Sequence, residues 1–210
     1  MLKFYDCKTA PSPRRARMVL AEKGLEVETV EVDLRSGEQL SDAFRAINPQ
    51  CTVPVLVLED GTRFTENAAI AAYAEAIKPD PPLLGSTPTE KGLVAGYNIW
   101  VEFQGLWAVA EVLRNTASGF AGRALTGPDN YQQIPELAER GRSRLIRFLD
   151  QLEERLEGRA YVAIDAFTVA DITAFITAEF AGWVKVDVND GRPNVAAYRE
   201  RVSARPSAKL

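Results

Sequence analysis

Few residues in this chain could carry chemistry, because its 210 positions include no histidine. Ser-His-Asp and Cys-His catalysis are therefore excluded, and so are most zinc sites. The two cysteines, Cys7 and Cys51, form no Cys-x-x-Cys motif, which argues against a disulfide framework, and no metal site is expected. Any catalysis must use hydroxyls, carboxylates, backbone amides or a group on the substrate.

Two hydroxyls lie in the turn Thr9-Ala10-Pro11-Ser12-Pro13, just before a helical pattern. A hydroxyl at a helix start can donate to an anionic group, and the helix dipole adds to the effect. Ser12 also precedes Pro13, where a capping serine is the residue type expected. The sequence supports these two roles of Ser12, hydroxyl donor and N-cap, about equally.

Glu66 and Asn67 stand at the start of an alanine-rich helical pattern. The unpaired N–H groups and the positive dipole end of a helix start form an anion site. The alternative is that Asn67 simply caps the helix, since asparagine is a good N-cap, and the two roles are compatible.

Pro54 interrupts the apolar run from Cys51 to Leu58, which otherwise has the composition of a buried strand. Proline has no N–H and is confined to strand starts, edges and bulges. Pro54 therefore marks a point where the ladder of the sheet is broken.

Strand-like and helix-like segments alternate around these residues, in the order βαβαββα. The expected strands cover 2–5, 25–34, 51–58 and a partner after the Asp60-Gly61 hairpin turn, and the expected helices end at Gly24, cover 37–46 and follow Phe64. Such an order predicts an α/β domain with a small mixed sheet and helices packed against it.

The second part of the chain has helical patterns only, and we expect an all-α domain there. Residues 80–88 are the expected linker, between a first domain at 1–79 and a helical domain at 89–210. A capping box at Thr87 and Glu90 begins the first long helix. Its expected core stripe is Ile99, Phe103, Leu106, Trp107, Ala110 and Leu113.

The composition is that of an ordinary soluble globular protein, with 46% apolar and 26% charged residues. The net charge of −4 gives no basic footprint for nucleic acid. No apolar stretch approaches the roughly 20 residues that span a membrane, and the N-terminus lacks the apolar region of a secretory signal. We therefore expect a cytoplasmic protein.

Four stretches of this chain, in this order, resemble the cytosolic glutathione transferases of bacterial type. They are Ala10 to Arg17 followed by Leu20 to Gly24; Asn48-Pro49 with Val53-Pro54-Val55-Leu56; Glu66-Asn67-Ala68-Ala69-Ile70; and Phe167 to Ile172. The resemblance covers essentially the whole chain and implies a thioredoxin-like N-terminal domain and a homodimer. It also implies glutathione as co-substrate and no metal.

The resemblance further assigns the parts of glutathione to residues of this chain. A cis Val53–Pro54 bond would present the Val53 backbone to the cysteinyl unit. The helix start at Asn67 would receive the γ-glutamyl carboxylate, Glu66 the α-amino group, and Gln39 the glycine end. The family most often has serine where this chain has Asn67.

The thiolate of glutathione must be stabilised without histidine, and the loop resembles the Ser/Asn type. Ser12 is the preferred hydroxyl donor and Thr9 the alternative, with backbone N–H groups as a third source. Other classes place a catalytic serine or cysteine at or just before Pro11, where this chain has Ala10. Cys7 is expected to pack as a small apolar residue.

The electrophile site is expected to include Trp100, Phe103 or Trp107, although most of that stripe is expected to be core. The resemblance implies transfer of the glutathione thiolate to small electrophiles. The alternatives are a glutathione-dependent peroxidase or disulfide reductase, and a non-catalytic interaction module of the same fold. A cluster of Arg14, Arg15 and Arg17 is interpreted as a solvated face with interface salt bridges, with attraction of anionic glutathione as the second choice.

Overall fold

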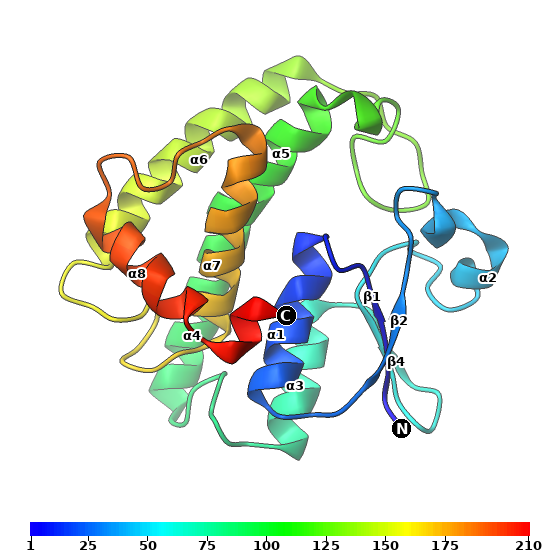
Figure 1. Ribbon diagram of the computed structural model, residues 1–210, viewed down its shortest axis with the longest axis horizontal. Helices are drawn as coiled ribbons and strands as arrows, with labels where there is room; N and C mark the ends of the chain where they lie inside the picture. The colour runs from blue at the N-terminus through cyan, green and yellow to red at the C-terminus, as the bar shows by residue number, and fades with distance from the viewer.

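The computed structural model describes residues 1–210, and Figure 1 shows a sheet-containing half beside a helical half. The sheet has the order β2-β1-β3-β4. β1 (Lys3–Asp6) runs parallel to β2 (Glu28–Glu31) and antiparallel to β3 (Val55–Val57), which is antiparallel to β4 (Arg63–Phe64). The predicted element order and the α/β fold class are confirmed.

Helix α1 (Pro11–Glu22) is shared by the two halves (Figure 1). Ala16 and Leu20 pack against the sheet, in a cluster with buried residues of β1, β3 and helix α3 (Asn67–Ile77). Met18 and Val19 point to the other side and belong to the large core of the helical half. The middle of α1 is therefore packed on both sides.

The strands are shorter than the sequence pattern predicts. Since Pro54 cannot donate to a ladder, β3 begins only after it. The predicted helix at 37–46 is divided, because the Ser41 side chain accepts a hydrogen bond from Phe44 N (3.2 Å) and starts a new helix. The resulting elements are η1 (Glu38–Leu40), α2 (Asp42–Arg45) and, after β4, α3 (Asn67–Ile77).

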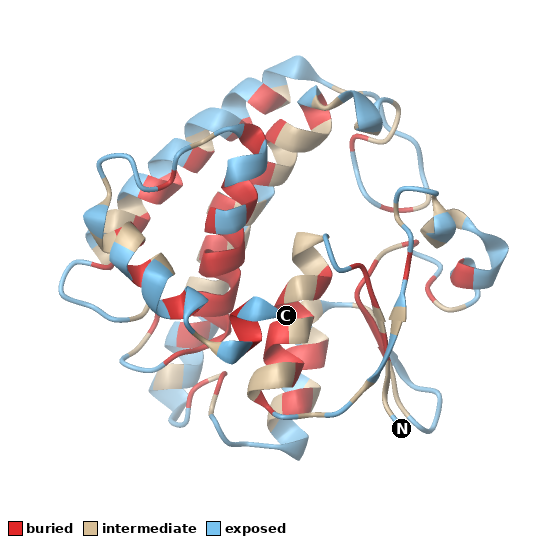
Figure 2. Ribbon diagram, in the orientation of Figure 1, coloured by how far each residue is buried: buried red, intermediate tan, exposed pale blue.

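The second half is helical, as predicted, and Thr87 and Glu90 form the predicted capping box. None of the helices is both long enough and apolar enough to cross a membrane. Figure 2 shows that α7 is the most continuously buried of them. The elements are α4 (Pro88–Trp100), η2 (Val101–Leu106), α5 (Trp107–Thr116), η3 (Ser118–Phe120), α6 (Pro135–Arg155), α7 (Val169–Ala181), η4 (Gly182–Val184), α8 (Pro193–Ser203) and η5 (Pro206–Lys209).

The predicted core stripe on the first long helix is wrong in part. Ile99, Phe103 and Trp107 are 63%, 59% and 47% exposed, whereas Leu106, Ala110 and Leu113 are partly buried against the core. The helix passes through a π-helical segment, η2, which rotates the following residues relative to a regular α-helix. The contact with α6 also demands small residues, since a Cβ on Gly105 would lie 2.6 Å from the Phe148 ring.

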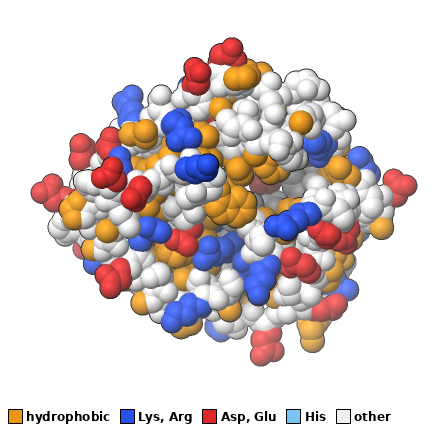
Figure 3. All heavy atoms as spheres, turned by 45° about the horizontal axis from the view of Figure 1, so that its top comes forward, with side chains coloured by type: hydrophobic (Ala, Val, Ile, Leu, Met, Phe, Trp, Pro, Cys, Tyr) orange, Lys and Arg blue, Asp and Glu red, His pale blue; other side chains and the backbone are white.

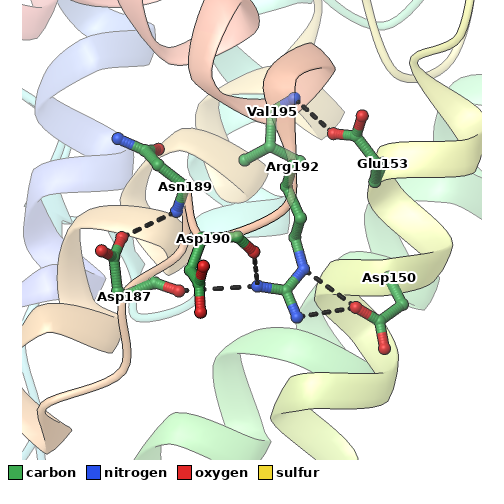
Figure 4. Close-up of polar contacts among 7 residues, drawn as sticks. All are labelled: Asp150, Glu153, Asp187, Asn189, Asp190, Arg192 and Val195. Carbon is green, nitrogen blue, oxygen red and sulfur yellow. Dashed lines mark hydrogen bonds and ion pairs between the residues drawn. The ribbon is translucent and has the colours of Figure 1, made fainter.

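Charged side chains form hydrogen bonds between α6 and the start of α8 (Figure 4). Glu153 accepts hydrogen bonds from the backbone N–H groups of Asn194 and Val195, at 3.0 and 2.8 Å, and so caps the start of α8. Arg192 donates to Asp150 Oδ1 from two nitrogens and to the Asp190 carbonyl. The carboxylates of Asp150 and Glu153 are therefore occupied by structural bonds.

Thr168 and Asp171 form the predicted capping box at the start of α7, and Asp171 is fully buried. Its Oδ2 accepts from the N–H and the hydroxyl of Thr168 (both 2.9 Å), and its Oδ1 accepts from Val162 N (2.8 Å). Burial raises the pKa of Asp171 to about 6, because the hydrogen bonds offset only part of the desolvation.

This raised pKa predicts a specific pH dependence of folding. Between the ordinary carboxyl pKa of about 4 and the folded value, the folded state holds a proton that the unfolded state has lost. The contribution of Asp171 is therefore greatest in acid and decreases as the pH rises through about 6. The unfolding free energy of the wild type minus that of Asp171→Asn should fall by roughly 2 kcal/mol between about pH 4 and about pH 7 in denaturant titrations. A difference that rises over this interval would contradict the assignment.

Candidate active site

The starts of α1 and α3 are joined by one hydrogen bond between predicted site residues. Asn67 Nδ2 donates to Ser12 Oγ over 3.0 Å, across 55 positions of sequence. Ser12 is the second residue of α1 and Asn67 the first of α3. The positive ends of both helix dipoles therefore meet at the same place.

The first turn of α1 offers unusually few donors. Pro11 and Pro13 have no N–H, and the N-cap residue, Ala10, has no polar side chain. The Ser12 N–H has no partner in the chain, so this residue supplies both a backbone and a hydroxyl donor. The alternative prediction that Ser12 is the N-cap is wrong, because the N-cap is Ala10 and the helix begins at Pro11, two residues earlier than that role requires.

The first turn of α3 has free backbone donors. Its first helical bond runs from Ile70 N to the Glu66 carbonyl (3.0 Å), which leaves the N–H groups of residues 67–69 without partners. Glu66 is the N-cap residue and is exposed, so Asn67 does not cap the helix. Three free N–H groups and a helix dipole are the features that an anion site needs.

Val53 lies beside this junction and offers its backbone. The Val53–Pro54 peptide bond is cis, as the resemblance implies. Val53 is buried in a cluster with Cys7 and with Ala10, the residue that precedes α1. Neither its N–H nor its C=O has a hydrogen-bond partner in the chain, and buried backbone groups rarely stay unpaired. An extended ligand could pair with both.

The other predicted site residues lie around this centre. Gln39 is half-buried in η1, and its Oε1 has no hydrogen-bond partner in the protein. Thr9 is exposed, and its hydroxyl lies 3.6 Å from Cys7 Sγ. Cys7 is buried among apolar side chains, as predicted, and so is Cys51, which has a left-handed φ of 54°.

The cationic cluster on α1 consists of structural ion pairs and hydrogen bonds. Arg14 donates to the Ala208 carbonyl at 3.0 Å and Arg17 to Asp6 at 2.5 Å. Arg15 is buried and donates to Glu102 Oε2 on η2 at 2.8 Å. The predicted interface salt bridge is therefore confirmed for Arg15, whereas Arg14 bonds a backbone carbonyl and Arg17 pairs within the first half. The expectation of a solvated face is wrong for Arg15, which is buried.

The predicted aromatic residues do not converge on Ser12. Trp100 packs on Tyr97 and Phe148 inside the helical half, with ring centroids 6.0 and 5.0 Å apart. The Phe103 ring lies 5.0 Å from the Arg144 guanidinium of α6, and the side chain that reaches α1 from the same segment is Glu102.

A loop that the sequence did not single out, residues 117–134, reaches the first half of the molecule. Figure 1 shows it running from the end of α5 towards the segment that contains α2. Arg123 holds its shape by donating to the carbonyls of Gly127 (2.7 Å) and Asp129 (3.1 Å). Gly127 is buried, and a Cβ built on it lies 3.8 Å from the Gln50 carbonyl, three residues before Val53.

Figure 3 shows the molecule with the top of the Figure 1 view turned forward. Near its centre is a hollow surrounded by hydrophobic side chains, with several lysine and arginine side chains around it. Such a mixture of apolar wall and cationic rim suits an apolar substrate used together with an anionic one.

Comparisons with known proteins agree with this geometry. Residues 9–77 match the glutathione S-transferase N-terminal domain and residues 117–206 the glutathione S-transferase C-terminal domain. Glutathione S-transferase 2 of Saccharomyces cerevisiae is 35% identical over 98% of this chain and 87% of its own. The crystal structure of Gtt2 from Saccharomyces cerevisiae is 35% identical, with a TM-score of 0.89, and covers 98% of both chains. A glutathione S-transferase domain-containing protein from Marinobacter aquaeolei is 37% identical, with a TM-score of 0.88 and the same coverage.

The bonds of Arg123 predict the local stability of the 117–134 loop. Arg123→Met removes the donors to two loop carbonyls, so local opening should become easier by about 1 kcal/mol or more. Amide hydrogen exchange within 122–131 should accelerate roughly tenfold, while α5 stays protected. Arg140→Met is the matched control, since Arg140 is exposed and pairs only with Glu111. Unchanged exchange in the Arg123 variant would show that the loop is held by other contacts.

Proposed function

The chain belongs to the glutathione S-transferase family and is a glutathione transferase, and we propose that Ser12, Val53 and Asn67 are central to its glutathione site. The observation that carries this proposal is the hydrogen bond from Asn67 Nδ2 to Ser12 Oγ, beside the unpaired backbone of Val53. Free N–H groups for a carboxylate, a hydroxyl for the sulfur and a free backbone for the peptide thus lie close together. An anionic tripeptide thiol needs these three kinds of group.

Glutathione binds as an extended peptide along this junction. The Val53 N–H and C=O pair with the backbone of the cysteinyl unit, as an added strand would. The γ-glutamyl carboxylate accepts hydrogen bonds from the free N–H groups at the start of α3, and Glu66 receives the α-ammonium group. Gln39 offers an unpaired side-chain oxygen or its amide N–H groups to the glycine end.

The sulfur of this cysteinyl unit then lies near the start of α1, because Val53 and Ala10 share one cluster. A free thiol has a pKa of about 8.5, so little of it is thiolate at neutral pH. The hydroxyl and N–H of Ser12, with the positive end of α1, stabilise the thiolate. Thr9 is the weaker candidate, because it is exposed and its hydroxyl lies against Cys7.

The electrophile reaches the thiolate at the start of α1. The thiolate attacks an electrophilic carbon, the new carbon–sulfur bond forms, and the leaving group departs with its electron pair. Among the predicted aromatic residues, Phe103 and Trp107 keep exposed rings and Trp100 is half-buried in the helical half. Nothing in the geometry favours peroxidase or disulfide-reductase chemistry based on protein cysteines, since both cysteines are buried.

A homodimer would cover the exposed apolar face of the first long helix. Ile99 and Phe103 are the most exposed large apolar side chains on that helix, and contiguous exposed apolar patches mark interfaces. A second copy with the same patch gives a two-fold, self-complementary contact. The family resemblance supports this assembly and a cytoplasmic location.

The role of Ser12 predicts the effect of Ser12→Ala. Loss of the hydroxyl should raise the pKa of bound glutathione by about one unit, since each unit corresponds to about 1.4 kcal/mol of thiolate stabilisation. Turnover of an aryl halide below that pKa should fall about tenfold, while the KM for glutathione changes little. Thr9→Ala is the control and should behave as the wild type. Normal turnover in Ser12→Ala with loss of turnover in Thr9→Ala would reassign the donor.

The dimer face predicts the effect of a charge at Ile99. Ile99→Glu should convert the dimer to a monomer in sedimentation velocity, because the interface cannot solvate a buried carboxylate. Ile146→Glu on α6, where the side chain is 43% exposed, should leave the dimer intact. A monomeric wild type, or dissociation in both variants, would argue against this face.

A further inference from the structure

The bond between Asn67 and Ser12 has a direction that matters for the thiolate. Asn67 Nδ2 is the donor and Ser12 Oγ the acceptor, at 3.0 Å. A serine hydroxyl has one hydrogen and two acceptor positions. Filling an acceptor position with Asn67 leaves the hydroxyl hydrogen free to be donated elsewhere.

The same bond makes the hydroxyl a better donor. Hydrogen bonds in a chain polarise one another, so a hydroxyl that accepts from an amide donates more strongly. The bond also fixes where the Ser12 oxygen lies relative to the start of α3. The hydroxyl of Ser12 donates to no other group of the chain.

The Asn67 side chain can form further hydrogen bonds besides the one to Ser12. Its amide carries a second N–H, and its Oδ1 is buried and has no hydrogen-bond partner in the protein. The backbone N–H groups of the first turn of α3 adjoin it. The side chain thus stands between the proposed carboxylate site and the proposed thiolate site.

We propose that Asn67 is a positioning residue that orients the Ser12 hydroxyl towards the glutathione sulfur and so couples the γ-glutamyl site to the thiolate site. The proposal rests on the proposed role of Ser12. It gives a physical reason for asparagine at a place where the family most often has serine: the longer amide reaches Ser12 and donates to it. The proton of the thiol leaves to solvent, and the Ser12 hydroxyl keeps its own hydrogen throughout.

Two substitutions separate this role from a merely structural one. Asn67→Ala removes the donor to Ser12. Asn67→Asp replaces the donor by an acceptor, which takes the Ser12 hydrogen away from the sulfur. A carboxylate at a helix start is favourable for the helix itself. Asn67→Asp should therefore keep or improve thermal stability while its thiolate stabilisation becomes worse than that of Asn67→Ala.

The experiment is a pH titration of bound glutathione, followed by the ultraviolet absorbance of the thiolate, at saturating glutathione. We expect the thiol pKa to rise in Asn67→Ala by about one unit, which is a tenfold loss of thiolate below the pKa. Asn67→Asp should raise it further. The double variant Ser12→Ala/Asn67→Ala should have the same thiol pKa as Ser12→Ala alone, because Asn67 acts on the sulfur only through the Ser12 hydroxyl.

The outcomes distinguish the role of Ser12 as donor from the coupling through Asn67. If Ser12→Ala leaves the thiol pKa unchanged, the role of Ser12 fails, whatever the Asn67 variants do. If Ser12→Ala raises the pKa but Asn67→Ala alters only the KM for glutathione, Ser12 is the donor and the coupling through Asn67 is overturned. Fully additive effects in the double variant would also overturn the coupling. Circular dichroism and thermal unfolding of each variant show that the fold is retained.

Discussion

The packing of α1 between the sheet and the helical half is the constraint on which the site depends. Its N-terminal end supplies the donors, and its position is set by contacts along its whole length. Arg15 pairs with Glu102 of η2, and at the other end Glu22 accepts hydrogen bonds from Arg205 at 2.8 and 2.7 Å. Displacing either half would therefore displace the helix start at which the sulfur is proposed to lie.

The proposed site offers few hydrogen-bond donors, and each lies at a defined place. Two prolines remove N–H groups from the first turn of α1, so Ser12 remains as the donor there. Val53 leaves two backbone groups unpaired beside it, and the first turn of α3 leaves three N–H groups free. A chain without histidine can stabilise a thiolate in this way, because preorganised dipoles replace a general base.

Local signals in the sequence predicted what depends on local geometry. The capping boxes at Thr87 and Thr168 and the break in the strand at Pro54 follow from residue types at short spacing, and the structure has them. The pairing of Ser12 with Asn67 could not be predicted, because it joins two helix starts 55 residues apart and depends on how both helices pack. The π-helical segment was missed because apolar periodicity assumes a constant turn, and its buried face carries small residues such as Gly105.

The long 117–134 loop was missed for a different reason. Its shape depends on arginine donors to backbone carbonyls, and such bonds leave no periodic pattern in the sequence. Its approach to the Gln50 backbone brings the helical half close to the segment that carries Val53. The proposed glutathione site is thus bounded by segments from both halves, although its proposed binding residues come from the first.

A crystal structure of the chain with glutathione bound tests the central claim most directly. We predict that the sulfur lies within hydrogen-bond distance of Ser12 Oγ, that the cysteinyl backbone pairs with both groups of Val53, and that the γ-glutamyl carboxylate lies at the start of α3. A sulfur placed against Thr9 or Cys7, with the Val53 backbone still unpaired, would contradict it.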